Sequence, residues 1–229
     1  MEFFIDGDAN RSVTFGIQRI VNAGFAGRNQ EAVWKHIEEL VKIGVPRPTS
    51  TPTFYPLLPD KITQAESLEV VGRGNSGEVE FVLFCQPEGL LVGLGSDHTD
   101  RELEKASILK SKQVYPNIVA KSVWRYEDVR DHWDQLIIRA WVGGENKQLY
   151  QEAKLSALIP PEELLPMVEK LLSVKLDGTA VFSGTVATLT EDIEFSDFFA
   201  MELEDPIRKQ VIKAAYRIKP IDWFLGPVD

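Results

Sequence analysis

Three acidic residues stand close together in a stretch of the sequence that reads as two consecutive strands. Glu78 and Glu80 enter the apolar run 81–85, and Asp97 follows the next apolar run, 90–94. Alternate residues of a strand share a face, so the two glutamates are expected on one side, roughly 7 Å apart. Two neighbouring strands can thus converge three hard oxygen ligands on one ion, a set that suits Mg²⁺, Mn²⁺ or Ca²⁺ better than zinc.

The surroundings of these acids bear on whether they hold an ion. The apolar residues after Glu80 are typical of a strand buried on both faces, where ionised carboxylates are costly unless they are paired or bind a cation. No lysine or arginine occurs between Gly74 and Asp100, so the local sequence offers no partner. From spacing alone an alternative stays open, in which the acids are merely solvated at an exposed strand mouth, because Glu-x-Glu is a weak motif.

The residues directly after Asp97 indicate the start of a helix. The run 99–102 has the form of a capping box with Thr99 as the N-cap. Asp100 would then lie in the first helical turn, where the helix dipole favours a carboxylate. We therefore prefer Asp97 to Asp100 as the third metal ligand.

Two further residues are candidates for a direct part in catalysis. His98 stands beside Asp97 and could act as a base or hold a water molecule. Lys112, if it faces the acids, could bind a substrate carboxylate or carbonyl oxygen. The alternative for a lone lysine is solvation at the surface.

The composition of the whole chain excludes several classes of protein. The 229 residues are 44% hydrophobic, which is typical of a globular protein of one large domain or two small ones. Lys and Arg total 25 against 35 Asp and Glu, a net charge of −10, which argues against nucleic acid or an anionic membrane as the main partner. No apolar run approaches the length of a membrane span.

A single cysteine, Cys85, excludes an intrachain disulfide and a cysteine-cluster metal site. It lies in an apolar run and reads as a small buried hydrophobic residue. Residues 1–6 lack the basic start and long apolar stretch of a signal peptide. We therefore expect a reducing, cytoplasmic location.

The remaining elements follow from periodicity and from Gly and Pro. We find no internal repeat and no domain boundary, so residues 1–229 are expected to form a single domain, with 1–50 as N-terminal strands and a helix packed on it. The Pro-rich loop 46–52 is either a lid or an ordinary connector. The other expected elements are strands at 3–5 and 13–20, a loop of small residues at 21–27, a helix from 29, a hairpin at 136–142 and 148–155, a helix from 160, and strands at 179–185, 198–204 and 211–218.

The order of these pieces resembles the core domain of the fumarylacetoacetate hydrolase superfamily, and most closely an uncharacterised branch, a domain of unknown function. The match runs from about residue 52 to 218. The motifs that carry it are Glu78-Val79-Glu80, Asp97, Thr99-Asp100-Arg101 and Lys112-Gln113 before Pro116, then the hairpin up to Gln151 and Phe182-Ser183-Gly184-Thr185.

The resemblance implies an α+β fold, a β-rich rolled mixed sheet with short flanking helices, and a homodimer. It implies one Mg²⁺ or Mn²⁺ held by Glu78, Glu80 and Asp97, with Lys112 facing it. The substrate contacts that it implies are Gly184, Thr185, Gln151 and Tyr55.

The chain departs from the family at several of these positions. Val186 replaces a proline, and Tyr55 takes the place of a frequent lid lysine. The family usually has an apolar residue at the position of His98, and the acid and base of its hydrolytic members have no counterpart that we can locate.

The function implied is a divalent-metal-dependent hydrolase that cleaves a C–C bond in a 1,3-dicarbonyl or 2-oxo acid. The first alternative is a lyase, a decarboxylase or hydratase of a 2-oxo acid. The second is a metal-stabilised ligand-binding protein without catalysis. Fold does not choose among them.

Overall fold

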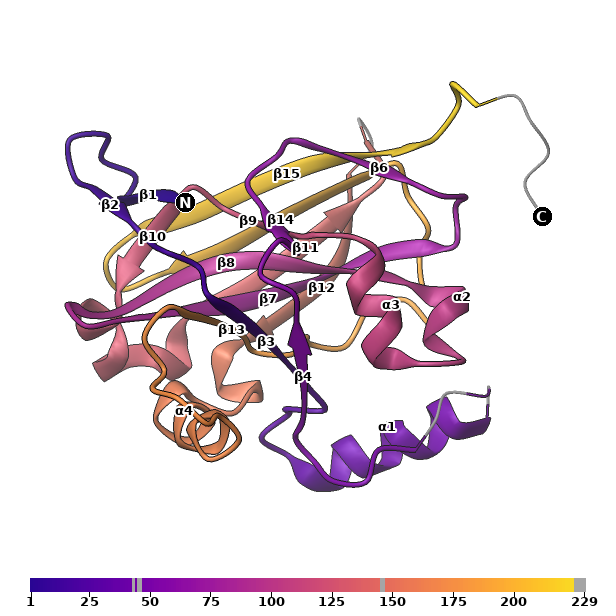
Figure 1. Ribbon diagram of the computed structural model, residues 1–229, viewed down its shortest axis with the longest axis horizontal. Helices are drawn as coiled ribbons and strands as arrows, with labels where there is room; N and C mark the ends of the chain where they lie inside the picture. Colours follow the sequence, from indigo (N-terminus) through magenta and orange to yellow (C-terminus); the bar gives the residue numbers. More distant parts are fainter. Residues whose placement is uncertain (43, 45–46, 145–146, 225–229) are drawn as a thin grey trace.

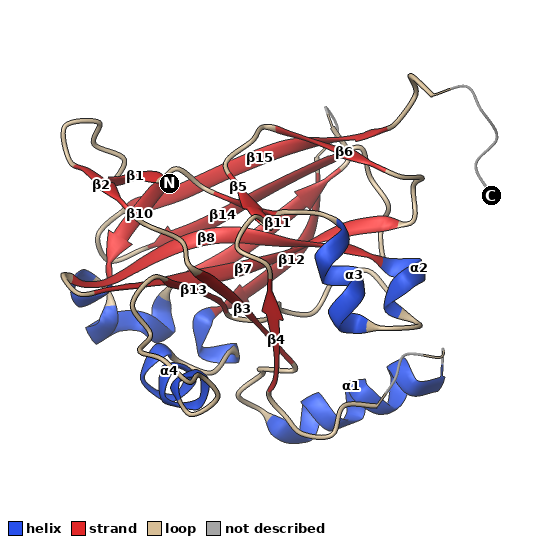
Figure 2. Cartoon of the chain, in the orientation of Figure 1, coloured by secondary structure: helices blue, strands red, loops and turns tan. Residues whose placement is uncertain are grey.

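The structure is a computed structural model that describes residues 1–42, 44, 47–144 and 147–224. Two sheets and a few short helices make up the molecule (Figures 1 and 2). The strands are β1 (Glu2–Ile5), β2 (Ser12–Thr14), β3 (Arg19–Gly24), β4 (Thr53–Leu57), β5 (Ile62–Thr63), β6 (Ser67–Val70), β7 (Asn75–Gln86), β8 (Gly89–Asp100), β9 (Asn117–Val119), β10 (Ser122–Arg125), β11 (Ile137–Val142), β12 (Gln148–Lys154), β13 (Thr179–Phe182), β14 (Phe198–Asp205) and β15 (Gln210–Pro220). The helices are α1 (Gln30–Lys42), α2 (Arg101–Glu104), α3 (Ile108–Val114) and α4 (Pro161–Glu169).

The larger sheet is organised around the long hairpin of β7 and β8. Its order is β2-β1-β10-β8-β7-β13-β3-β4, with β9 paired to β8 and β5 paired to β9. The hairpin ladder runs from Asn75 opposite Asp100 to Gln86 opposite Gly89. Parallel pairs (β1 with β10, β13 with β3, β5 with β9) occur among antiparallel ones, so the sheet is mixed.

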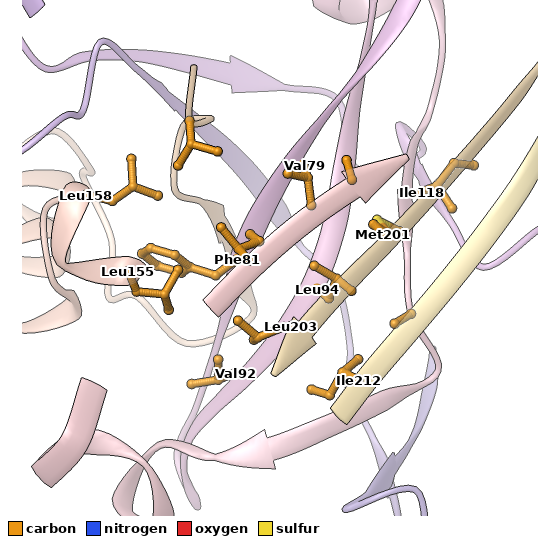
Figure 3. Close-up of a cluster of buried hydrophobic side chains, with 14 of the residues drawn as sticks. Val79, Phe81, Val92, Leu94, Ile118, Leu155, Leu158, Met201, Leu203 and Ile212 are labelled. Atoms are coloured by element: carbon orange, nitrogen blue, oxygen red, sulfur yellow. The ribbon is translucent and has the colours of Figure 1, made fainter. Parts of the chain in front are cut away.

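The smaller sheet has the order β12-β11-β14-β15-β6 and packs against one face of the larger sheet. Strand alternation sends the odd-numbered residues of β7 to this face. They meet even-numbered residues of β8 and the inner side chains of β14 and β15 in the main core (Figure 3). Members of that core include Val79, Phe81, Val92, Leu94, Ile118, Met201, Leu203 and Ile212.

The opposite face of the larger sheet holds a second apolar core. Val82 and Phe84 of β7 pack there with residues of β1, β3, β9 and β13. Gly95 permits this close packing, because a Cβ at that position would lie 2.8 Å from the side chains of Phe182 and Val82. Further along the same face of β7, Glu80 and Glu78 replace the apolar residues.

The expected fold class, a β-rich rolled mixed sheet with short flanking helices, is confirmed. The expected loop at 21–27 was wrong in part, because β3 continues to Gly24 and pairs with both β13 and β4. The expected N-cap Thr99 was also wrong: Thr99 still pairs with Ser76 in the hairpin, and Asp100 caps α2 instead.

Among the described residues, no helix is both long and apolar enough to cross a membrane.

Candidate metal centre

The three predicted acids come together on one face of the β7–β8 hairpin. Glu78 lies directly opposite Asp97 in the ladder, and Glu80 lies opposite Gly95. One ligand oxygen from each acid can be chosen so that all lie within 4.8 Å of one another. Glu80 and Asp97 are fully buried, whereas the Glu78 side chain keeps 22% of its surface exposed. The cluster is therefore enclosed at Glu80 and Asp97 and accessible to solvent at Glu78.

Two cations face these acids, and both come from the helices that follow β8. The Lys112 ammonium of α3 contacts the Asp97 carboxylate and lies 3.6 Å from Glu78 Oε2. Arg101, at the start of α2, lies 3.0 Å from Glu78 Oε1 and donates to Ser76 Oγ at 2.8 Å. The paired acids are thus not solvated at an open strand mouth.

Within the described part of the chain, Glu78 and Asp97 form ion pairs with Arg101 or Lys112, whereas Glu80 forms none. Burial raises the pKa of Glu80 well above its usual range, and the negative charge of Asp97 adds to the rise. Burial acts on Glu78 in the same direction, but Arg101 and Lys112 outweigh it and lower its pKa. Burial would lower the pKa of Lys112, yet the facing carboxylates raise it, so this ammonium stays charged.

These residues fit a divalent cation on the chemistry of the donor set. Carboxylate oxygens are the ligands that Mg²⁺ and Ca²⁺ prefer, and octahedral Mg²⁺ holds neighbouring ligand oxygens about 3 Å apart. In the structure one oxygen of each acid lies within 4.8 Å of the other two, near enough for all three to ligate a common ion. An ion bound beside Glu80 would favour the charged form of this carboxyl and so lower its raised pKa.

Gly184 and Thr185 lie beside the acids but act first on the protein itself. The Gly184 N–H donates to Glu80 Oε2 at 2.9 Å and so orients that ligand. Its φ of +79° and a Cβ position only 3.0 Å from the Ala23 carbonyl oxygen favour glycine there. The Thr185 hydroxyl donates to the Val79 carbonyl, so its proton is already used.

Gln151 has a structural role in the observed geometry. Its Oε1 accepts from the Val79 N–H at 3.1 Å, and its Nε2 donates to Thr185 Oγ1 at 2.8 Å and to the Val186 carbonyl. These bonds replace the ladder bonds that β7 loses where β13 ends. Gln151 is buried, and all of its bonds go to the protein.

His98 does not point toward the acids. Because it is adjacent to Asp97 on β8, its side chain lies on the opposite face of the sheet. There its Nδ1 lies 2.9 Å from the Tyr216 hydroxyl and its Nε2 lies 2.8 Å from Asn75 Oδ1. Both ring nitrogens are engaged, so the expected role as base does not enter our proposal.

Tyr55 of β4 lies on the same face of the sheet as the acids. It pairs with Asn22 of β3 in the register of the sheet. Burial raises the pKa of Tyr55, and the positive charge of Lys112 acts in the opposite direction. The Tyr55 phenol is therefore close enough to Lys112 to interact with its charge. Its use in substrate binding stays a prediction.

Sequence reasoning missed Arg101 as a partner of Glu78. A signal was present, because a basic residue follows directly on the strand that carries Asp97. The direction of His98 was also available from the sequence, since neighbouring residues of a strand point to opposite faces.

A surface cavity of about 340 Å³ lies away from the acids. Its lining includes Arg73 of the β6–β7 loop, Asn75 of β7, Phe195 of the segment before β14, and Ile218 of β15. It meets the network of His98 through Asn75 but contains none of the three acids. We place the candidate site at the acids because their chemistry, and not the size of a hollow, suits an ion.

Comparison with solved structures identifies the fold. A fumarylacetoacetate hydrolase family protein from Yersinia pestis CO92 superposes with a TM-score of 0.66 at 14% identity, over 90% of this chain and 95% of that one. The yeast fumarylacetoacetate hydrolase family protein ynq8 gives 0.60 at 15% identity, over 93% and 96%. The 2-keto-3-deoxy-D-arabinonate dehydratase complexed with magnesium and 2,5-dioxopentanoate gives 0.62 at 14% identity, over 93% and 78%.

The chain therefore has the fold of the fumarylacetoacetate hydrolase superfamily. More narrowly, it belongs to the family described as a protein of unknown function, DUF2848, whose model matches residues 23–216. A search of the curated proteins finds no match.

Proposed function

We propose that this protein is a divalent-metal-dependent enzyme that acts on a 2-oxo acid or a 1,3-dicarbonyl compound, cleaving a C–C bond by hydrolysis. The observation that carries the proposal is the convergence of Glu78, Glu80 and Asp97 with Lys112 beside them. The cofactor proposed is Mg²⁺ or Mn²⁺. The Mg²⁺-bound dehydratase of the same fold supports a keto acid as the class of substrate.

Each residue of the site has a part that its geometry supports. Glu78, Glu80 and Asp97 would bind the ion, and when bound it supplies a Lewis acid that polarises the substrate's carbonyl oxygens. The Gly184 N–H holds Glu80 in place, and Arg101 holds Glu78. The Lys112 ammonium can donate from Nζ to a substrate carboxylate or enolate oxygen.

A lyase reaction is the second candidate. Two observations favour it: the imidazole of His98 is turned away from the acids and bonded on both nitrogens, and a solved protein of this fold is a dehydratase. A product assay separates the two reactions. If an oxo acid gives only dehydration, or only CO₂ and a ketone, hydrolysis is excluded.

The first experiment measures the thermal stability of the wild type and of Glu78→Gln/Glu80→Gln with and without Mg²⁺ or Mn²⁺. A ligand that binds only the folded state raises Tm. At a free ligand concentration of a hundred times Kd, it adds about 2.7 kcal/mol to the free energy of unfolding. We expect this rise in the wild type and not in the double variant. Glu88→Gln, at the exposed turn of the same hairpin, should respond like the wild type.

Turnover tests the enzymatic part of the proposal. Keto acids should be consumed by the metal-loaded wild type and not by Glu80→Gln. Metal binding without turnover of any keto acid would leave the non-catalytic binding protein as the better description. We also propose a homodimer, as the resemblance implies, and a cytoplasmic location, which the single cysteine favours. Light scattering in solution checks the mass of the homodimer.

A further inference from the structure

Two buried asparagines on the face of the sheet that carries the acids have polar atoms without partners among the described residues. Asn22 of β3 and Asn117 of β9 are both fully buried. The Asn117 Nδ2 group donates to Asn22 Oδ1 at 3.3 Å. Among the described residues, Asn22 Nδ2 and Asn117 Oδ1 find no hydrogen-bond partner.

The register of the sheet puts Asn117 next to a predicted metal ligand. β8 and β9 run antiparallel with Gly95 opposite Val119 and Ser96 opposite Ile118. One step further along this register, Asn117 comes beside Asp97. Opposed residues of an antiparallel pair share a face, so the Asn117 side chain lies on the face of Asp97.

Asn22 lies on the same face of the sheet, but on a strand beyond β7 instead of beyond β8. It pairs with Phe182 of β13, which in turn pairs with Val82 of β7. Phe182, Val82 and Val119 all belong to the second core, on the face that carries Glu80. The sheet curls enough for Asn22 and Asn117 to touch across it. The pair therefore lies on the face of the sheet that carries the acids, with Asn117 next to Asp97 in the register.

The hydrogen bond within the pair determines which polar groups of the two amides remain without a partner. An amide side chain carries one carbonyl oxygen and one NH₂ group. One hydrogen bond between two amides leaves one oxygen and one NH₂ group without a partner. The same is true if the oxygen and nitrogen positions are exchanged in both amides. A buried polar group without a partner costs roughly 1–3 kcal/mol. Because the unpaired groups of this pair reduce the stability of the fold, they point to a hydrogen-bond or metal-ligand partner that is present when a ligand is bound.

A divalent ion with its carboxylate ligands satisfies both free groups. An amide oxygen is a ligand of the same hard class as a carboxylate, and it adds a donor without adding charge. The free NH₂ group can donate to a ligating carboxylate, as the outer partners of metal ligands do. Both asparagines are fully buried on the face that carries the acids, whereas the Glu78 side chain is partly exposed.

We propose that Asn22 and Asn117 complete the metal centre, with the free amide oxygen binding the ion or one of its water molecules. This inference rests on the proposed function, because it requires that Glu78, Glu80 and Asp97 bind a divalent ion. It assigns the asparagines to positioning the ion, and it predicts an effect on affinity that is measured without any substrate.

The test compares Mn²⁺ and Mg²⁺ affinity, by calorimetry and by the shift in Tm, in the wild type and in Asn22→Leu/Asn117→Leu. We expect Kd to rise at least roughly tenfold, the effect of losing an outer-sphere partner. The metal-free Tm should stay the same or rise, because leucine fills nearly the same volume and removes both unpaired groups. An asparagine pair with only a structural role would produce the opposite pattern, a lower metal-free Tm and an unchanged Kd.

Asn75→Leu is the matched control. Asn75 is equally buried and lies on β7, but it faces the other core, where it contacts His98. We expect a lower metal-free Tm and an unchanged Kd. Asn117→Ser is measured in the same way if the double variant does not fold.

The outcomes separate this inference from the proposed function. No response of the wild type to either metal overturns both. A wild-type response that Asn22→Leu/Asn117→Leu retains in full overturns only the role of the asparagines.

Discussion

Two neighbouring residues on β8 point to opposite faces of the sheet. Asp97 faces the acid cluster, and His98 faces the interior between the two sheets. Burial lowers the pKa of His98 to about 3, and the positive charge of Arg101 acts in the same direction. The imidazole is thus neutral in the folded protein over the whole physiological range.

This neutral histidine predicts a pH dependence of stability. The pKa of a histidine in an unfolded chain is about 6.5. Below that pH, His98 therefore binds a proton in the unfolded chain but not in the folded protein. Stability is then complete above about pH 6.5 and is lost as the pH falls toward 3. At pH 5 the loss is roughly 2 kcal/mol, at about 1.36 kcal/mol per pH unit.

Denaturant unfolding at pH 7 and pH 5, in metal-free buffer, measures this loss. His98→Gln should be less stable than the wild type at pH 7 but should lose less stability on acidification. An equal loss in both proteins would mean that His98 is protonated in the folded state.

At the scale of elements, the join between the two sheets depends on Gln151 of β12. It satisfies the Val79 N–H, the Val186 carbonyl and the Thr185 hydroxyl where β13 leaves β7. Gln151→Leu should lower the free energy of unfolding by about 2–4 kcal/mol, because buried groups lose their partners. Gln148→Leu, exposed on the same strand, should change it by less than about 0.5 kcal/mol. Equal denaturation midpoints for both variants would contradict the role of Gln151.

The sequence predicts those parts of the site that depend on local order. Glu78, Glu80 and Asp97 meet because a hairpin pairs residues that are near in sequence, and alternation decides their face. The helix start after β8 was predicted one residue early, because Thr99 is still held in the ladder by Ser76. The end of a strand depends on its partner strand, which a local helix signal does not report.

The parts that escape prediction depend on distant pairing. Asn22 was assigned to a loop because its neighbours are small residues, yet β3 pairs in parallel with β13, more than 150 residues later in the chain. Asn117 reaches the site through the pairing of β9 with β8. Neither residue has a spacing motif, since the contact between them is made by the curl of the whole sheet.

At the scale of the molecule, the candidate site joins elements that lie far apart in the chain. Glu80 connects β7 to the end of β13 through the Gly184 N–H, and Lys112 connects α3 to β8 through Asp97. An ion held by the acids would restrain all of these elements together. Strand β2, at an edge of the larger sheet, pairs with β1 and carries none of these ligands.

Hydrogen exchange tests this coupling. With Mn²⁺ or Mg²⁺ present, we expect slower amide exchange in β7, β8, α3 and residues 182–185, since local openings there break the site. Amides of β2 that exchange through local opening at the sheet edge should keep their rates. Glu78→Gln/Glu80→Gln should show no change on adding metal. Slowing confined to β7 and β8 would show that Lys112 and Gly184 do not transmit the restraint, and that the ion stabilises only the hairpin that holds it.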